Sequence, residues 1–322
     1  MMKLSIMNAF LESGDAVVDQ ALEKWGYDPE SVRFMRASST FIFYFERDQK
    51  KFILRLTPEG NVEQINQELA YLAYLEEKQL SVHQAYPSIA GNLVETLESS
   101  LGTFYATVFT FLEGEQYEME DLTKTQFYLW GEALGELHKH SKEYKKRGEY
   151  TLSKAFMSAS DIIPESEHSA RHELAVVNNW LESLKQTPQN FGRIHFDFEL
   201  DNLIWKDGFQ IVDFESSLDG WYCADIAFAL RDLFVEKVEL TDPSFQQFLQ
   251  GYRSETAITD EEIAHIPMFL RLHNLISFAK LVKTVDVERN PEHPEWLEGL
   301  RATLCLKIED YRSGFQRERE RF

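Results

Sequence analysis

The 322-residue sequence predicts an α+β protein with two lobes: a small N-terminal lobe around an antiparallel β-sheet, and a larger, mostly helical C-terminal lobe. Dense runs of aromatic and β-branched residues occur before residue 112. Helical periodicity dominates after Gly114, and one β-rich segment at 193–213 interrupts it. We therefore expect residues 1–112 and 113–322 to form the two lobes, joined by a connector near 112–116.

The first lobe is expected to begin with one helix over residues 8–25, where apolar residues recur at helical spacing. Asn61 has the character of an N-cap, with Gln64 as its reciprocal partner, and predicts a second helix behind it. The polar segment 46–51 suits a hairpin loop between two strands. The expected strands are 41–45, 52–56, 93–97 and 104–111.

The second lobe should contain helices at about 121–142 and 167–185, and further helices from the β-rich segment to the end. The clearest of the later helices carries apolar residues between Phe269 and Val282. No run reaches the roughly 18 apolar residues that a membrane span needs.

The chain contains 33 basic and 54 acidic residues, a formal charge of −21. Such a surface disfavours nucleic acid and anionic membranes as partners, and suits a cationic small molecule or simply keeps the protein soluble. The two cysteines, Cys223 and Cys305, form neither a disulfide framework nor a metal-binding pair. With no signal-like apolar run at the start, a reducing, cytoplasmic location is expected.

The most informative segment is a predicted β-hairpin near residue 205. Asp207-Gly208 separates the apolar runs Leu203–Trp205 and Phe209–Val212, and this dipeptide favours a tight turn. Pairing of the two runs brings Asn202, before the first strand, next to Asp213, after the second.

An amide and a carboxylate at one end of a hairpin can hold a hard cation such as magnesium through their oxygens. Asp197 lies on the loop just before, where a free carboxylate can orient an attacking hydroxyl group and accept its proton. The alternative interpretation is a polar loop whose Asp and Asn side chains only cap turns.

The spacing His195-x-Asp197, four residues and then Asn202 resembles the catalytic loop of kinases, and Asp213-Phe214 stands where their metal-binding Asp-Phe-Gly lies. More specifically, the segment resembles the aminoglycoside phosphotransferase and choline kinase superfamily. The resemblance is dense over 193–232, moderate over 30–115 and faint in the helical tail. It implies a protein-kinase-like fold and magnesium-dependent transfer of the ATP γ-phosphate to a hydroxyl group of a small molecule.

The resemblance also implies roles for individual residues. Asp197 corresponds to the catalytic base, Asn202 and Asp213 to magnesium ligands, and His195 to a residue that braces the loop. Asp225 corresponds to an acid that supports the catalytic loop, although a charge at a helix N-terminus is an equal alternative.

Two positions depart from the superfamily pattern. Phe196 replaces a common Gly in the catalytic loop, at a position that varies. Glu215 replaces the Gly of Asp-Phe-Gly, a position where the small-molecule kinases that the chain resembles often carry an acid. It is either an auxiliary metal contact or a solvated acid.

Arg55 lies inside an apolar strand, which is unfavourable unless the charge has a partner. It stands in the place of the kinase strand lysine, and Glu68 on the following helix is its expected ion-pair partner. The alternative is a solvated Glu68 and an Arg55 on an edge strand.

The expected phosphate-binding turn, Arg36 to Thr40, has no glycine. Ser38 and Ser39 are small enough to allow close approach of phosphates and can donate hydrogen bonds, although an ordinary polar turn has the same composition. Adenine is expected at the connector, against the backbone of Phe111 and Glu113.

For the acceptor site, the acids Glu199, Asp201 and Asp219 and the aromatic Trp221 predict an amine-bearing alcohol, because acids and aromatic faces attract cations. Amino sugars, choline-like compounds and hydroxy-amino acids such as homoserine fit this description. The alternative is that Trp221 is a core residue.

Three other functions were weighed. The glycine-free turn favours a nucleotide-binding scaffold with impaired catalysis, against which the set of Asp197, Asn202 and Asp213 argues. A protein kinase is disfavoured by Glu215 and by the lack of an Ala-Pro-Glu segment. A metallohydrolase is disfavoured because no histidines have a recognised zinc-binding spacing.

Overall fold

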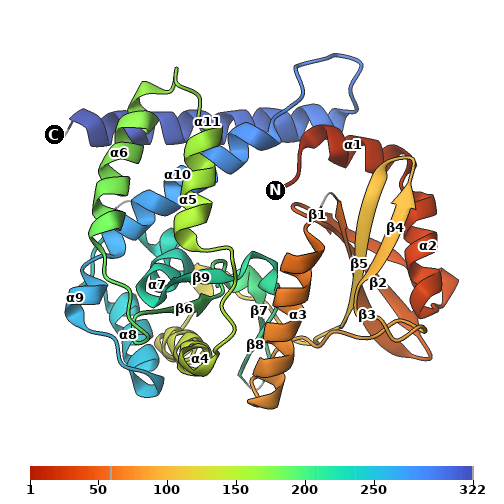
Figure 1. The fold of residues 1–322 in the computed structure, drawn as a ribbon, viewed down its shortest axis with the longest axis horizontal. Helices are drawn as coiled ribbons and strands as arrows, with labels where there is room; N and C mark the ends of the chain where they lie inside the picture. Colours follow the sequence, from red (N-terminus) through yellow and green to blue (C-terminus); the bar gives the residue numbers. More distant parts are fainter. Residues whose placement is uncertain (59, 207, 236, 321–322) are drawn as a thin grey trace.

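The computed structural model describes residues 1–58, 60–206, 208–235 and 237–320. Figure 1 shows the N-terminal β-sheet and its helices beside a larger helical group, while the last helix runs along both. The predicted two-lobed α+β fold is confirmed. The helices are α1 Leu4–Ser13, α2 Asp15–Trp25, α3 Val62–Glu77, α4 Lys124–Glu143, α5 Leu152–Ile162, α6 His168–Ser183, α7 Tyr222–Ala229, α8 Pro243–Glu255, α9 Asp260–Ile263, α10 Ile266–Thr284 and α11 Glu295–Glu320.

The N-terminal sheet is antiparallel throughout, in the order β1-β2-β3-β5-β4. Its strands are β1 Arg33–Ala37, β2 Phe41–Arg47, β3 Lys50–Pro58, β4 Glu95–Ser99 and β5 Gly102–Thr110. The four predicted strands are confirmed, and β1 is additional. This edge strand is mostly exposed, so its sequence lacks the apolar alternation that marks a half-buried strand. The β2–β3 turn is narrower than predicted, with Asp48 and Gln49 at positive φ between the paired Arg47 and Lys50.

One face of the sheet is buried against α1 and α2 in an aromatic-rich cluster that includes Phe41, Phe45 and Trp25. The prediction of a single helix over 8–25 is wrong, because Gly14 separates α1 from α2. The Gly14 N–H donates to the Phe10 carbonyl at 2.7 Å, and a Cβ at Gly14 would lie only 2.5 Å from that oxygen. Glycine therefore permits this close turn.

Helix α3 crosses the other face of the sheet. The Asn61 side chain caps it by accepting a hydrogen bond from the Glu63 N–H, which confirms the predicted start. The reciprocal bond expected from Gln64 is not among the contacts of this cap.

The C-terminal lobe is built around the largest hydrophobic cluster, to which α4–α8, α10 and α11 contribute. Helices predicted at 121–142 and 167–185 correspond to α4 and α6, whereas α5 was not predicted. Two small antiparallel sheets lie inside this lobe: β6 Phe191–Ile194 with β9 Leu218–Trp221, and β7 Leu203–Trp205 with β8 Phe209–Ile211. No helix within the described ranges is long and apolar enough to cross a membrane.

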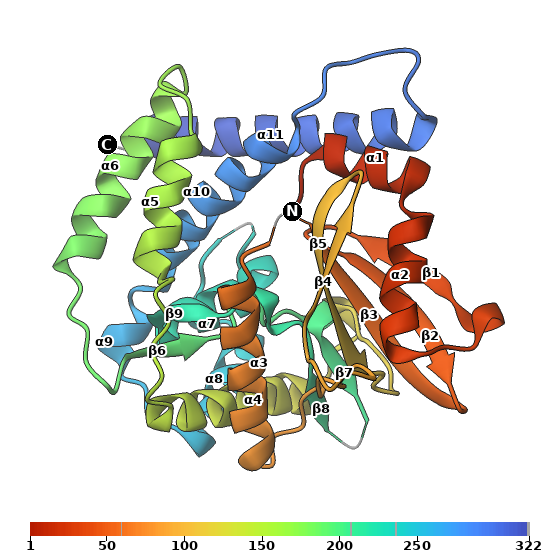
Figure 2. The ribbon, with the colours of Figure 1, turned by 45° about the vertical axis from the view of Figure 1, so that its right-hand side comes forward.

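Several contacts hold the lobes together. Glu115 in the connector exchanges backbone hydrogen bonds with Trp205, and the Gln210 side chain donates to the Glu113 carbonyl at 3.2 Å. On the opposite side, Ser5 of α1 donates to the Asp286 carboxylate. Figures 1 and 2 both place the N-terminus between the lobes, close to where α1 meets α11.

Candidate active site

The β7–β8 hairpin forms as predicted, with Leu203 opposite Ile211 and Trp205 opposite Phe209. Gly208 has a φ of 139°, which favours glycine, while its predicted turn partner Asp207 lies outside the described residues. The second strand ends one residue earlier than predicted.

Asn202 and Asp213 lie together at the open end of this hairpin, because the Val212 N–H donates to the Asn202 carbonyl at 3.0 Å. The buried Asn202 side chain donates through Nδ2 to the Asp197 carbonyl at 2.9 Å, which leaves its amide oxygen as a free acceptor. Asp213 adopts a left-handed conformation and forms an ion pair with Arg36 at 2.9 Å. The hairpin thus brings the predicted acid, amide and catalytic loop into one site.

Asp225 holds the catalytic loop from below. Its carboxylate accepts hydrogen bonds from the backbone N–H groups of His195 at 2.8 Å and Phe196 at 2.7 Å, and His138 lies 3.0 Å away. Asp225 is completely buried. These contacts favour the loop-supporting interpretation of Asp225 over a simple charge at a helix terminus.

The substitution of Phe196 for the common Gly has a conformational consequence. Phe196 has a φ of 72°, a left-handed conformation that costs a non-glycine residue roughly 1–2 kcal/mol. The two hydrogen bonds to Asp225 hold the two consecutive N–H groups that lead into the Phe196 Cα, and so stabilise this strained geometry.

His195 is fully buried, and its Nε2 lies 3.0 Å from the Val212 carbonyl. The ring therefore ties the catalytic loop to the end of the hairpin, next to Asp213. This placement suits a bracing role, since a side chain with no exposed surface cannot contact a substrate.

The Asp197 carboxyl lies beside Glu199 and Arg231. Arg231 approaches Asp197 at 3.5 Å and forms a shorter ion pair with Glu199. Burial raises the pKa of Glu199 to about 8, and its hydrogen bond to Asp197 adds to this. Burial also acts to raise the pKa of Asp197, but the hydrogen bond from Glu199 and the charge of Arg231 lower it overall. The pair therefore leaves Asp197 as a carboxylate able to accept a proton.

Arg231 was not predicted from the sequence. It stands 34 residues after Asp197 and follows α7, so only the folded chain brings the two together. Its position just after the helix that carries Asp225 is the one local signal that could have identified it.

The predicted Arg55–Glu68 ion pair is confirmed. Two hydrogen bonds of 2.8 and 2.7 Å join the guanidinium to the carboxylate, and each side chain is 3% exposed. Burial alone would lower the pKa of Arg55, but the Glu68 carboxylate raises it overall. The alternative of an edge-strand Arg55 is wrong, because β3 lies in the middle of the sheet.

The predicted phosphate-binding turn joins β1 to β2 and lies over the hairpin end. Ser39 donates to the Glu215 carboxylate at 3.2 Å, and the Ser38 N–H bonds to the Thr40 carbonyl. Burial, together with nearby carboxylates, raises the pKa of Glu215 to about 7 although Arg55 opposes this. Glu215 is therefore a partly buried group that is hydrogen-bonded to the turn.

At the connector, the Phe111 N–H donates to the Lys51 carbonyl at 3.2 Å. The Glu113 side chain pairs with Lys51 at 2.8 Å and with Lys206 at 3.9 Å. A Cβ on Gly114 would lie 2.3 Å from the Trp205 carbonyl oxygen, so glycine lets the connector approach the hairpin closely.

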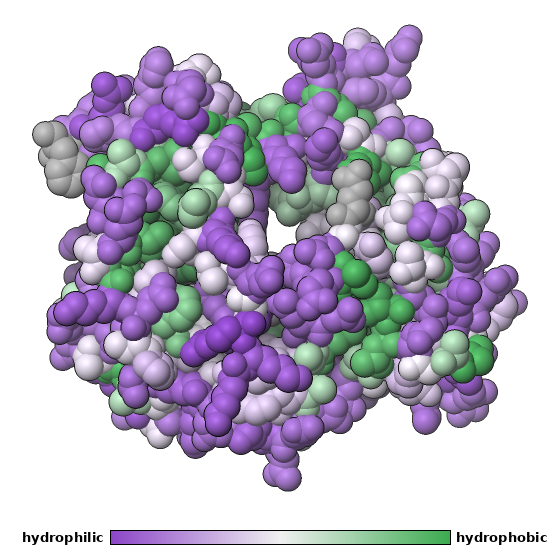
Figure 3. Space-filling view, viewed as in Figure 1, coloured by the Kyte–Doolittle hydropathy of each residue, from purple (hydrophilic) through white to green (hydrophobic). Residues whose placement is uncertain are grey.

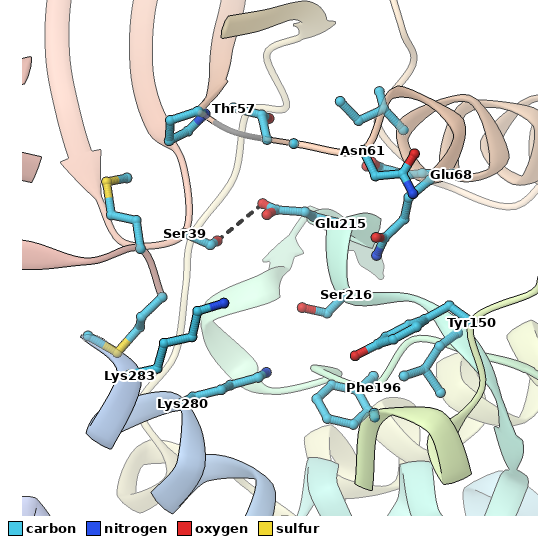
Figure 4. A pocket seen from close by; sticks show the side chains of 18 of the residues that line it. Ser39, Thr57, Asn61, Glu68, Tyr150, Phe196, Glu215, Ser216, Lys280 and Lys283 are labelled. Carbon is cyan, nitrogen blue, oxygen red and sulfur yellow. Dashed lines mark hydrogen bonds between the residues drawn. The ribbon is translucent and has the colours of Figure 1, made fainter. Parts of the chain in front are cut away.

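A cavity of about 460 Å³ opens between the lobes beside this site (Figure 4). Its walls come from the N-terminal segment, the β1–β2 turn, the start of α3, the segment after Asp213, and α10. Charged, aromatic and aliphatic side chains line it, among them Glu68, Tyr150, Phe196, Glu215, Ile276, Lys280 and Lys283.

None of the four predicted acceptor-binding residues lines this cavity. Asp219 is buried against Arg193 at 3.2 Å, and Trp221 is 5% exposed and packs against Phe191. Both belong to β9, whose residues are all buried, so the core interpretation of Trp221 holds. Glu199 pairs with Arg231, and the exposed Asp201 accepts a hydrogen bond only through its backbone.

A two-lobed fold with a buried Arg–Glu pair above a His-x-Asp loop, and with an amide and an acid at the end of a hairpin, defines a phosphotransferase with a protein-kinase-like fold. The chain belongs to the phosphotransferase enzyme family, whose sequence model matches residues 32–258. The predicted superfamily and the predicted phosphotransferase class are thereby confirmed.

Individual relatives agree. The chain is 24% identical over 308 residues to the amicoumacin kinase of Bacillus subtilis (strain 168), covering 90% of this chain and 91% of the relative. Among solved structures, an amicoumacin kinase in complex with AMP-PNP, Ca2+ and Ami has a TM-score of 0.77 at 21% identity, over 92% of this chain and 93% of that one. A microcompartment-associated aminopropanol kinase has a TM-score of 0.67 at 20% identity, over 93% and 98%.

Proposed function

We propose that this chain transfers the γ-phosphate of ATP to a hydroxyl group of a small molecule in a magnesium-dependent reaction. The observation that carries the proposal is the joint position of Asn202, Asp213 and the catalytic loop at the hairpin end. Residues 1–112 would bind the nucleotide, and residues 113–322 would supply the catalytic loop and most of the acceptor site.

The donor set fits magnesium. Asn202 keeps a free amide oxygen, and Asp213 offers a carboxylate that now pairs with a half-exposed Arg36. Magnesium prefers oxygen ligands and needs few from the protein, because water and phosphate oxygens complete its shell. When bound, the ion neutralises charge on the phosphates.

The protein groups have separate tasks in this proposal. Asp197 orients the acceptor hydroxyl and accepts its proton, consistent with the lowered pKa of this carboxyl. Arg55 supplies positive charge along the phosphates, held in place by Glu68. The hydroxyl groups of Ser38 and Ser39 and the N–H of Ser39 would approach the phosphates from the β1–β2 turn, because the Ser38 N–H already donates to the Thr40 carbonyl.

Adenine would bind against the backbone of the connector. The Glu113 carbonyl already accepts a hydrogen bond from Gln210 and the Phe111 N–H donates to Lys51, so the Phe111 carbonyl and the Glu113 N–H are the groups of these two residues proposed to contact the base. A cytoplasmic location remains a prediction, consistent with Cys223 and Cys305 both being free thiols.

The acceptor class we propose is an amine-bearing alcohol. Support comes from the similarity to a kinase of aminopropanol and from Glu215, an acid that lines the cavity next to the catalytic loop. This acid takes the place of the four residues expected from the sequence.

A nucleotide-binding scaffold of the same fold is the second candidate. One observation favours it: Arg36 occupies the carboxylate of Asp213, the residue expected to hold the metal. The two candidates differ in turnover, because a scaffold binds ATP but does not convert it to ADP.

The test is ADP release from ATP and Mg2+ with a panel of amino sugars, choline-like compounds and hydroxy-amino acids. We expect acceptor-dependent turnover that falls roughly 100- to 10,000-fold in Asp197→Asn, the range for loss of a general base. Asp310→Asn, on the exposed surface of α11, is the matched control. Binding of ATP with no ADP release in the presence of any acceptor would favour the scaffold.

A further inference from the structure

We propose that the acceptor carries an anionic group, a carboxylate or a phosphate ester, which Lys280 and Lys283 bind. This inference rests on the proposed kinase function and narrows its substrate class. Of the amine-bearing alcohols considered above, it selects those that also bear a negative charge, such as hydroxy-amino acids.

Both lysines project from α10 into the cavity. They are three residues apart, so they share one side of a helix whose other residues are largely buried. Figure 4 shows the two side chains entering the cavity from α10, opposite Ser39 and Glu215. The Lys280 ammonium lies 4.8 Å from the centre of the Phe196 ring, next to the residue proposed as the base.

Neither lysine has a counter-charge in direct contact among the described residues, although the carboxylates of Asp197 and Glu215 act to raise the pKa of Lys280 against the effect of burial. Among the residues that the structure describes, neither forms an ion pair, although 54 acidic residues outnumber 33 basic ones in the chain. Glu68 and Glu215 line the same cavity, but Arg55 already binds both oxygens of Glu68. Burial lowers the pKa of Lys280, so an added anion would stabilise its charged form.

The surrounding wall suits an organic molecule. Tyr150, Phe196 and Ile276 line the cavity together with the two lysines, and apolar walls with a few charged groups are typical of small-molecule sites. Figure 3 shows the hollow between the lobes bordered mainly by hydrophilic residues on the face in view. The β1–β2 turn, which is expected to hold the phosphates of ATP, contributes Ser39 to the opposite wall.

The positions of the charges give the acceptor an orientation. Its anionic group faces α10, while an amine faces Glu215 across the cavity. The hydroxyl group lies between these ends, near the catalytic loop that begins at Phe196.

Matched compounds test this directly. Homoserine has the hydroxyl and amine of 3-amino-1-propanol plus a carboxylate on the same carbon chain, and glycerol 3-phosphate offers a hydroxyl with a phosphate ester. Each is tested at constant ionic strength against the wild type, the variant Lys280→Gln/Lys283→Gln, and the control Lys307→Gln on exposed α11. Two readouts are needed: ADP release, giving kcat and KM for acceptor and ATP, and the shift in melting temperature.

We expect kcat/KM for homoserine to exceed that for 3-amino-1-propanol roughly tenfold, the scale of one charge-assisted hydrogen bond. The double variant should lose this preference and the thermal shifts from both anionic compounds, while KM for ATP stays within about twofold. The control variant should behave as wild type. The relative shifts from homoserine and glycerol 3-phosphate tell a carboxylate site from a phosphate site.

Other results separate the two proposals. One such result is a thermal shift caused by homoserine that vanishes in the double variant, while no acceptor supports ADP release from ATP. That result would retain the anion site and reject the kinase. Turnover of homoserine that is no faster than that of 3-amino-1-propanol, and that the double variant leaves unchanged, would retain the kinase and overturn the anion site. A rise in KM for ATP alone would assign the lysines to the nucleotide, and no response to any anionic compound in either readout also overturns the inference.

Discussion

Replacing Asp225 by Asn should disorganise the catalytic loop while leaving nucleotide binding nearly intact. The Asp225 carboxylate accepts hydrogen bonds from the His195 and Phe196 N–H groups, one on each oxygen. Asparagine keeps one acceptor and turns an NH2 donor toward the second N–H. One buried N–H group then lacks a partner, which costs about 1–3 kcal/mol.

The strained conformation of Phe196 adds to this cost. Its left-handed backbone is unfavourable by roughly 1–2 kcal/mol, and the lost hydrogen bond is one that holds it. The loop is therefore restrained by roughly 2–5 kcal/mol, the sum of the two contributions. If about half of this restraint acts on the position of Asp197, kcat falls roughly 5- to 70-fold, at 1.36 kcal/mol for each tenfold. KM for ATP should change little, because Arg55 and the connector are not in contact with Asp225.

The double variant Phe196→Gly/Asp225→Asn separates strain from a general loss of stability. Glycine adopts positive φ without strain, so kcat of the double variant should exceed the product of the two single effects. The measurements are steady-state ADP release and thermal unfolding for the four members of the cycle, with Asp310→Asn as the surface control. Kinetic effects that simply multiply would refute the idea that the carboxylate restrains a strained loop.

Two further predictions concern buried charge. Glu68→Gln leaves the Arg55 guanidinium without its counter-charge and should destabilise the protein by about 3–5 kcal/mol, measured by thermal unfolding. The double variant Arg55→Met/Glu68→Leu should recover most of this stability, but steady-state kinetics should show that the KM for ATP does not recover. The carboxyl group of Glu199 lies among Asp197, Arg231 and Asp232, and its pKa of about 8 in the folded state is above the unfolded value. The stability that this group contributes is therefore complete below about pH 4.5 and is lost as the pH rises toward 8. Glu199→Gln should therefore flatten the fall in unfolding free energy between pH 5 and 8, and an unchanged slope would show that this carboxyl does not titrate there.

The parts of the site that could be predicted from sequence are those fixed by local geometry. A hairpin brings the residues at its two ends together whatever surrounds it, so Asn202 and Asp213 follow from the Gly208 turn and its flanking runs. Arg55 and Glu68 follow from energetics, because a charge inside an apolar strand must find a partner.

The site residues that were not predicted correctly depend on the direction of side chains and on segments far apart in the sequence. Asp219 and Trp221 lie close in sequence to Asp213, but pairing of β9 with β6 buries them in the core. Arg231 and the α10 lysines enter the site from helices whose relative placement no local pattern specifies. The lysine pair has a weak signal, two ammonium groups three residues apart in the last turns of a largely apolar helix.

The net charge of the chain and the charges that line the cavity favour different substrates, and the two act on different steps of binding. The formal charge of −21 favours a cationic ligand, yet Lys280 and Lys283 line the cavity proposed for the acceptor together with Glu215. Exposed charges farther away than the Debye length of about 8 Å are largely screened at physiological salt. Binding is therefore governed by the few charges that line the cavity, while the acidic exterior acts mainly on the rate of encounter. A molecule that bears both an amine and an anion satisfies Glu215 and the lysine pair at once, and it approaches the acidic exterior with little net charge.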